Sequence, residues 1–225
     1  MSLNWQPLTV NGSICGIEAR LAHLHFFFGT RFTKKEDLQN FFPHYKFSFL
    51  KQIHGAQVVQ ANPHDTLQAD AHFTSQLNVA LVVQTADCLP ILLAGAEQIF
   101  AIHAGWRGIE QNIIGACKPQ FKGPPLIAAV GPHIQQKSFE VGLDVASQLE
   151  TLLPAAVSQH PSPEKKWVDL NLIAAKQLKE SCGTEVKIDF LTHDTVTDPL
   201  FHSFRRGKQT PDRQYSFVVI TDHSS

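Results

Sequence analysis

The sequence predicts an α+β fold in which mixed β-sheets have helices packed outside them. Short apolar runs of strand length outnumber the segments with helical spacing, and most follow one another too closely for repeated βαβ units. Several of these runs are continuously apolar, which is typical of strands that are covered on both faces. The chain has 225 residues, enough to bury a sizeable core, and we expect a single domain over residues 1–225.

The expected strands are apolar segments that end at turn-forming or polar residues. They are 24–28, 47–50, 57–60, 78–84, 91–94, 99–103, 126–130, 186–191 and 215–220. The run at 78–84 reads NVALVVQ and shows almost no alternation, so we expect it to be buried. A short turn, Gly95-Ala96-Glu97, separates the strands at 91–94 and 99–103 and predicts a hairpin.

Four segments are expected to be helical. They are 34–42, 108–118, 143–153 and 169–180. The apolar residues of 108–118 fall on one side of a helix, and Pro119 ends the segment. Gly183 is placed to cap the last helix at its C-terminal end. The proline-rich segment 160–163 is expected to connect two elements of the same domain.

Composition and charge narrow the classes of protein. Charged residues make up 17% of the chain and hydrophobic residues 43%, which excludes intrinsic disorder and a coiled coil. Lys and Arg number 19 and Asp and Glu number 20, for a formal net charge of −1. The chain has no excess of basic residues, so its composition does not indicate nucleic acid or an anionic membrane as a partner.

The cysteines and the N-terminal segment indicate a cytoplasmic protein. Cys15, Cys88, Cys117 and Cys182 form no CxxC pair and are too sparse for a disulfide framework, so we expect reduced thiols. The start MSLNWQPLTV lacks a basic segment followed by an apolar one, so we expect no secretion signal. No apolar run reaches about 18 residues, the length that a membrane-spanning helix requires.

Three motifs place reactive side chains at the ends of apolar strands, where loops deliver residues to a cleft. His54 lies in QIHG, Cys88 in TADCLP and His103 in HAGWRG. Imidazole and thiolate both bind zinc, and three protein ligands leave a fourth position open for water or substrate. Two alternatives stay open for Cys88, which are a buried core thiol and a nucleophile with a histidine base.

Several further residues are candidates for catalysis or anion binding. Arg107 lies between glycines directly before a helical segment, which suits a phosphate or carboxylate, although a tight turn with a solvated arginine is the plainer interpretation. Arg205 and Arg31 present the same choice. Asp87 directly precedes Cys88 and is the nearest candidate by sequence for a proton shuttle.

Two weaker patterns involve alternating residues. Asp70 and His72 would share one face of a strand, and the sequence does not decide whether that face lines a cleft or meets solvent. His23 and His25 form an HxH pair that is conceivable as a copper site, but we expect it to face solvent. A blue-copper site with an axial methionine is disfavoured because Met1 is the only methionine.

Taken together, the motifs resemble the YfiH-like family. They are KQIHGAQVV at 51–59, ADAHFT at 69–74, ALVVQTADCLPILL at 80–93, AIHAGWRG at 101–108, AVGPHIQQKSFEVG at 129–142 and FHSFRR at 201–206. This family has carried the labels polyphenol oxidase (laccase), purine nucleoside phosphorylase and peptidoglycan-editing factor. The resemblance implies mixed sheets sandwiched between helices in α/β/β/α layers, and a zinc site formed by His54, Cys88 and His103, with copper as the alternative metal.

The resemblance also implies a reaction. It is zinc-dependent phosphorolysis of adenosine, inosine, guanosine and methylthioadenosine, with adenosine deamination as a second activity, so that a small nucleoside and phosphate are the expected partners. Cys88, Asp87 and Arg107 are then the expected catalytic residues, and Arg31 and Arg205 are expected to bind substrate or phosphate. Three alternatives stay open: an amidase that edits a peptidoglycan precursor at the same site, a copper-dependent polyphenol oxidase, and a non-catalytic metal-binding or partner-binding protein.

Overall fold

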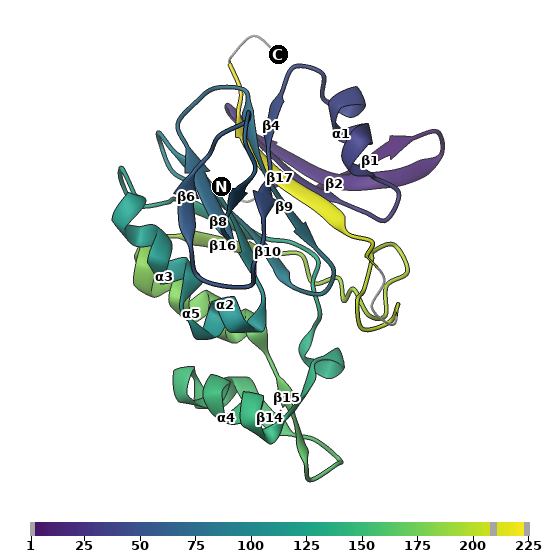
Figure 1. Cartoon of the computed structure of the whole chain (residues 1–225), viewed down its shortest axis with the longest axis vertical. Coiled ribbons are helices and arrows are strands. Elements are labelled where there is room, and N and C mark those ends of the chain that lie inside the picture. The colour runs from purple at the N-terminus through teal and green to yellow at the C-terminus, as the bar shows by residue number, and fades with distance from the viewer. Residues whose placement is uncertain (1–2, 208–210, 223–225) are drawn as a thin grey trace.

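The chain forms four layers in the order helix, sheet, sheet, helix, which confirms the α+β fold of mixed sheets between helices (Figure 1). The structure is a computed structural model that describes residues 3–207 and 211–222. From edge to edge, the first sheet contains β1 (Gln6–Val10), β2 (Ser13–Leu21), β3 (Leu24–Gly29), β17 (Gln214–Ile220), β9 (Val79–Thr85) and β4 (Lys46–Ser48). The second contains β16 (Lys187–Phe190), β12 (Ile127–Val130), β10 (Leu89–Ala94), β11 (Ile99–Ala104), β8 (Ala71–Thr74) and β6 (Val58–Gln60).

Helices cover the outer face of each large sheet. Helix α1 (Lys35–Phe41) packs on the first sheet, and α2 (Trp106–Glu110), α3 (Ile113–Cys117) and α5 (Leu170–Cys182) pack on the second (Figure 1). Helix α4 (Leu143–Leu152) packs on a small sheet of three strands, and two further short strands form a separate pair. These smaller strands are β13 (Glu140–Gly142), β15 (Lys165–Val168) and β14 (Val157–Gln159), and the pair β5 (Leu50–Lys51) and β7 (Leu67–Gln68).

The unbroken apolar run at 78–84 is explained by burial of both faces of β9. Leu81 and Val83 point into the core between the two sheets, whereas Ala80 and Val82 point to the outer core beneath α1. All four side chains are at most 1% exposed. A strand in the middle of a layered fold has no solvent face, so its sequence shows no alternation.

The segment 108–118, predicted as one helix, is instead two short helices. Asn112 separates α2 from α3 and adopts a left-handed backbone conformation with φ of 57°. Its side chain accepts a hydrogen bond from the backbone N–H of Gly115, so Asn112 caps the start of α3. Asparagine tolerates this conformation better than most residues, which permits the break in an otherwise helical pattern.

The other predicted elements have boundaries that differ from the prediction by small amounts, with one informative exception. The strand expected at 47–50 is divided, because β4 pairs with β9 in the first sheet while β5 leaves that sheet and pairs with β7. The proline-rich segment 160–163 lies in the connection of the antiparallel pair β14 and β15, so it joins two elements of the same small sheet.

Among the helices that the structure describes, none is long and apolar enough to cross a membrane.

Replacing the buried residue His72 with glutamine is expected to flatten the loss of stability in acid. His72 has no exposed surface, and burial lowers its pKa to about 3. In the unfolded chain the ring binds a proton below a pH of about 6.5. The free energy of unfolding therefore falls as the pH drops from about 6.5 towards 3, by about 1.4 kcal/mol per pH unit for this group, and is unaffected by it above that window.

Urea unfolding between about pH 6 and pH 4 measures this effect. The slope of unfolding free energy against pH should be shallower in His72→Gln by about 1.4 kcal/mol per pH unit, which is the contribution of one proton. The exposed His64 provides a matched control, and His64→Gln should leave the slope unchanged. An unaltered slope in His72→Gln would contradict the assignment.

Candidate metal centre

Three side chains from separate parts of the chain meet at one point. His54 lies in the connection between β5 and β6, Cys88 precedes β10, and His103 is on β11. One ligand atom from each residue lies within 4.8 Å of the other two. The antiparallel register of β10 and β11 pairs Pro90 with His103, which brings Cys88 and His103 to the same end of these two central strands. These are the residues that the three sequence motifs indicated.

The two histidine rings face the sulfur from different directions. The rings of His54 and His103 are nearly perpendicular, with an interplanar angle of 88° and centroids 4.7 Å apart. His54 is exposed, Cys88 is partly exposed and His103 is buried. The cluster therefore has one wall inside the protein and one side open to the surface.

The electrostatics of the cluster favour a thiolate. Burial alone would raise the pKa of the Cys88 thiol, but the charge and hydrogen bonds of His103 and His54 outweigh it and lower the pKa to about 6. Burial alone would lower the pKa of His103, but the Cys88 thiolate and the Asp70 carboxylate outweigh it and raise the pKa to about 9. These opposite shifts favour a thiolate beside an imidazolium in the metal-free cluster, and binding a metal ion would then release the imidazolium proton.

The donor set fits zinc. Two imidazole nitrogens and one thiolate are typical zinc ligands, and a site with three protein ligands and an open side is the catalytic arrangement. His103 also has the hydrogen-bonded partner that a metal-ligating histidine usually has, because its Nδ1 lies 2.8 Å from Oδ1 of Asp70. Among the described residues, this is the one group of three or more metal-ligating side chains that lies close enough together to share an ion.

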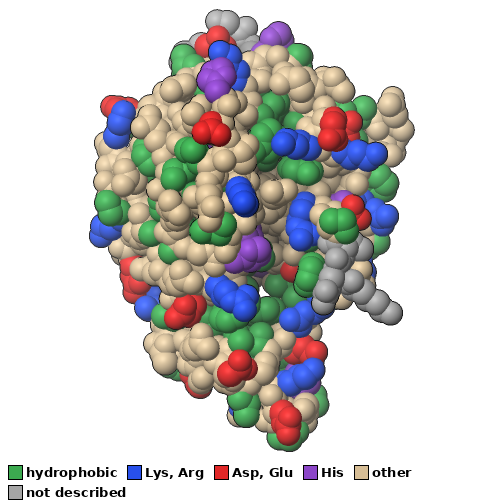
Figure 2. All heavy atoms as spheres, in the orientation of Figure 1, with side chains coloured by type: hydrophobic (Ala, Val, Ile, Leu, Met, Phe, Trp, Pro, Cys, Tyr) green, Lys and Arg blue, Asp and Glu red, His purple; other side chains and the backbone are tan. Residues whose placement is uncertain are grey.

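A cavity of about 1130 Å³ opens at the cluster. Its lining comes from the ends of β9 and β11, the start of α2, the segment around β13 and the last loop before β17. The charged and aromatic lining residues besides the cluster are Asp87, Trp106, Arg107, Phe139, Glu140, Phe204, Arg205 and Arg213. On the face shown in Figure 2, a histidine side chain is exposed near the middle, and Lys or Arg side chains lie on several sides of it.

The three arginines proposed from the sequence have different environments. The guanidinium of Arg107 lies over the ring of Trp106, 4.4 Å from its centroid, in the lining of the cavity. Arg205 also lines the cavity, but one of its nitrogens donates to the carbonyls of Ser138 and Glu140. Arg31 is exposed, is not among the described residues that line the cavity, and points a nitrogen at the carbonyl of Pro199, 3.4 Å away.

Asp87 holds the loop that forms one side of the cavity. One carboxylate oxygen accepts a hydrogen bond from Oγ1 of Thr195 at 2.7 Å, and the other accepts from the backbone N–H of Arg205 at 2.8 Å. Asp87 itself has a φ of 86°, in the left-handed region that most residues avoid. The loop is further ordered by Arg206, whose guanidinium donates to four backbone carbonyls.

The sequence did not decide whether Asp70 lines a cleft or meets solvent. In the structure, Asp70 contacts the residues of the cluster. It has no exposed surface, and its carboxylate contacts both histidine-bearing segments. Burial alone would raise its pKa, but hydrogen bonds from His103, Gly55 and His54 outweigh burial and lower it. The only sequence signal was its alternation with His72 in ADAHFT, which placed it on a strand face without identifying the face.

The expectation that His23 and His25 face solvent together is wrong for His25. Its side chain is fully buried, with Nδ1 3.0 Å from the hydroxyl of Tyr45 and Nε2 2.8 Å from a carboxylate oxygen of Glu18. Both ring nitrogens are therefore engaged. His23 lies in the turn before β3, so the pair does not share one strand face.

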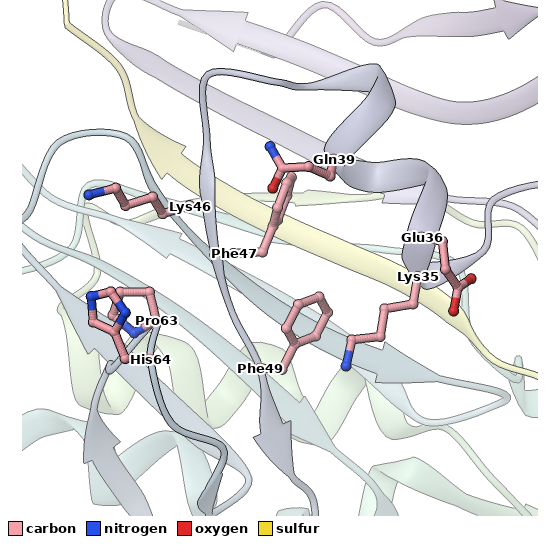
Figure 3. Close-up of a pocket in the computed structure, with 8 residues that line it drawn as sticks. All are labelled: Lys35, Glu36, Gln39, Lys46, Phe47, Phe49, Pro63 and His64. Atoms are coloured by element: carbon pink, nitrogen blue, oxygen red, sulfur yellow. The ribbon is translucent and has the colours of Figure 1, made fainter.

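A second, smaller cavity of about 590 Å³ lies between α1 and β4, on the outer face of the first sheet (Figure 3). Phe47 and Phe49 form its floor, and the ammonium of Lys35 lies 4.2 Å from the centroid of the Phe49 ring. None of its described lining residues belongs to the set predicted from the sequence motifs.

Comparisons with known proteins identify the family of the chain. The family described as "multi-copper polyphenol oxidoreductase laccase" matches residues 34–221. A purine nucleoside phosphorylase of Pseudomonas aeruginosa is 39% identical over 188 residues, covering 78% of this chain and 74% of its own. One from Rickettsia conorii is 33% identical over 200 residues, covering 83% of this chain and 81% of its own.

Solved structures share the fold. The crystal structure of the Neisseria meningitidis protein NMB0706 superposes with a TM-score of 0.83 at 27% identity, covering 92% of this chain and 100% of that one. YlmD from Geobacillus stearothermophilus superposes with a TM-score of 0.81 at 20% identity, covering 96% of this chain and 99% of its own.

Proposed function

The chain belongs to the YfiH-like family, described as multi-copper polyphenol oxidoreductase laccase, and from this premise we propose that it is a metal-dependent purine nucleoside phosphorylase. The observation that carries the proposal is the convergence of His54, Cys88 and His103 at the wall of a cavity with arginine and aromatic side chains. The volume of about 1130 Å³ has room for a nucleoside and a phosphate together. The relatives named purine nucleoside phosphorylase support this choice of reaction.

Phosphorolysis transfers the ribosyl group from the base to phosphate. A phosphate oxygen forms a bond to C1′ as the bond from C1′ to the purine nitrogen breaks, and the purine leaves with the electron pair and takes up a proton. We assign phosphate binding to Arg107, which lines the cavity and has a planar guanidinium suited to an anion. The aromatic rings of Trp106, Phe139 and Phe204 supply surfaces for the planar base and the apolar side of the sugar.

A zinc ion bound at the cluster would supply Lewis-acid polarisation of a substrate oxygen. The chain's own residues prepare this chemistry. The neighbouring histidines keep Cys88 ionised, and Asp70 orients His103. Cys88 is then a metal ligand in our proposal, because a sulfur bound to a metal ion is not free to act as the nucleophile.

In this proposal Asp87 is a positioning residue. Both of its carboxylate oxygens already accept hydrogen bonds, so we assign it to hold the loop around Thr195 and Arg205 rather than to move a proton. We also assign Arg205 to positioning, since its guanidinium donates to the carbonyls of Ser138 and Glu140, at and just before the start of β13, and so connects the loop to that segment. The substrate set proposed from the resemblance is adenosine, inosine, guanosine and methylthioadenosine, with adenosine deamination as a second activity of the same cavity.

The copper alternative has less support from the site. A multicopper oxidase needs several copper sites, whereas the described residues provide one cluster of three ligands. The amidase alternative places an amide in the same cavity, and no contact in the structure distinguishes this reaction from phosphorolysis. A direct assay separates these functions.

Incubation of the zinc-loaded protein with inosine and phosphate is expected to release hypoxanthine. Release should stop when the metal is removed by a chelator, should return when zinc is added back, and should require phosphate, with sulfate as the control anion. Liquid chromatography of the base and of ribose 1-phosphate measures the products. Unchanged hypoxanthine release after verified zinc removal would overturn the metal-dependent mechanism, and release of ribose in place of ribose 1-phosphate would overturn phosphorolysis.

A further inference from the structure

We infer that Asp70 is a positioning residue that arranges both histidine ligands before any metal ion binds. It directly precedes β8, the neighbour of the strand that carries His103. Nδ1 of His103 lies 2.8 Å from Oδ1 of Asp70, and the backbone N–H of His103 donates to the backbone carbonyl of Asp70 at 2.7 Å. Because the carboxylate accepts the Nδ1 proton, Nε2 is the ring nitrogen left to face the cluster.

The same carboxylate holds the turn that carries His54. The backbone N–H of His54 donates to Oδ1 at 2.9 Å and that of Gly55 donates to Oδ2 at 2.7 Å, while that of Ile53 lies 3.2 and 3.3 Å from the two oxygens. His54 has a φ of 59°, in the left-handed region that residues with a side chain seldom adopt. Three consecutive N–H groups aimed at one buried carboxylate stabilise this turn.

The positions of two metal ligands, His54 and His103, thus depend on one side chain. Asp70 itself is not among the residues whose ligand atoms lie close enough together to share an ion. Asp70 has no exposed surface, so its hydrogen bonds do not compete with solvent. Its negative charge is balanced by four N–H donors. Asparagine has the same shape, but its amide NH₂ would face at least one of these donors, so Asp70→Asn breaks the arrangement without leaving a cavity.

The inference rests on the proposed function only in taking the cluster to be a metal site. Zinc affinity, measured by competition with a chromophoric chelator, is expected to be about 10- to 100-fold weaker in Asp70→Asn than in the unaltered protein. Circular dichroism and thermal unfolding establish that the variant is folded. A folded Asp70→Asn protein that binds zinc within about twofold of the unaltered protein would overturn the inference.

Asp169→Asn is the matched control. The Asp169 carboxylate also accepts backbone hydrogen bonds from consecutive residues, Asn171 and Leu172, but it does so at the start of α5. Its substitution should leave zinc affinity unchanged. A loss of affinity equal to that of Asp70→Asn would show a general effect of removing a carboxylate that accepts backbone hydrogen bonds, and would also overturn the inference.

A second measurement needs no variant. In the metal-free protein labelled with ¹⁵N-histidine, His103 is expected to show a slowly exchanging Nδ1 proton that is hydrogen-bonded to a carboxylate. Absence of that proton would overturn the inference even if Asp70→Asn fails to fold. Neither measurement uses a nucleoside, so a chain that proves inactive on nucleosides would refute the proposed function and leave this test intact.

Discussion

Replacement of Cys88 by serine is expected to remove zinc binding and nucleoside phosphorolysis together. Cys88 is the only sulfur in the cluster, and its histidine neighbours lower its pKa to about 6, so it is ionised at neutral pH. Serine keeps the size of the side chain but stays protonated and offers a much weaker ligand. Loss of a residue that only supports a ligand costs about 10- to 100-fold in metal affinity, so we expect the loss of the ligand itself to exceed about 100-fold.

Metal content by mass spectrometry of the native protein, together with the hypoxanthine assay, measures both effects. Cys15→Ser is the matched control, because Cys15 is another free thiol, lies outside the cluster and makes a local contact through its sulfur with the carbonyl of Ser13. This control should retain zinc and activity. Full zinc retention with lost activity in Cys88→Ser would contradict the ligand assignment and favour a nucleophilic cysteine.

Replacement of Arg107 by glutamine is expected to weaken phosphate use while leaving zinc binding intact. The Arg107 guanidinium lies in the cavity lining over Trp106, within the same lining as the cluster. A hydrogen bond to a charged group contributes about 1.5–3 kcal/mol, which corresponds to a fall of about 10- to 100-fold in kcat/KM for phosphate. Most of the change should appear in KM, because the residue is assigned to binding.

Arg31→Gln is the matched control for this prediction. The sequence suggested both arginines as anion-binding residues, but Arg31 is exposed and is not among the described residues that line the cavity. Steady-state kinetics with phosphate as the varied substrate should show little change in Arg31→Gln. Equal losses in the two variants would contradict the assignment of phosphate to the wall formed by Arg107.

The family description and the names of the relatives point to different chemistries, and the geometry favours one of them. The family is described by copper and polyphenol oxidation, whereas the two relatives compared above are named purine nucleoside phosphorylases. A single cluster of two histidines and one cysteine beside a cavity with arginines suits one metal ion and an anionic substrate. The described residues contain no second cluster of this kind, which a multicopper centre would require.

Much of the fold was predictable because its signals are local. The buried strand at 78–84, the hairpin around Gly95-Ala96-Glu97 and the helix that begins after Asp169 each depend on residues close together in the chain. The break at Asn112 escaped prediction because one residue in a left-handed conformation interrupts a helix without changing its apolar spacing.

By itself, the sequence determined which residue types stand at the ends of the strands, and its motifs indicated His54, Cys88 and His103 as one set. Only the tertiary structure decided that Asp70 joins the two histidines, that both oxygens of Asp87 are already bonded, and that Arg31 lies outside the cavity lining. The physical reason is that hydrophobic periodicity reports the local burial of a side chain over a few residues. Which groups share a hydrogen bond depends on strand register and layer packing, which join residues 15 to 118 positions apart at this site.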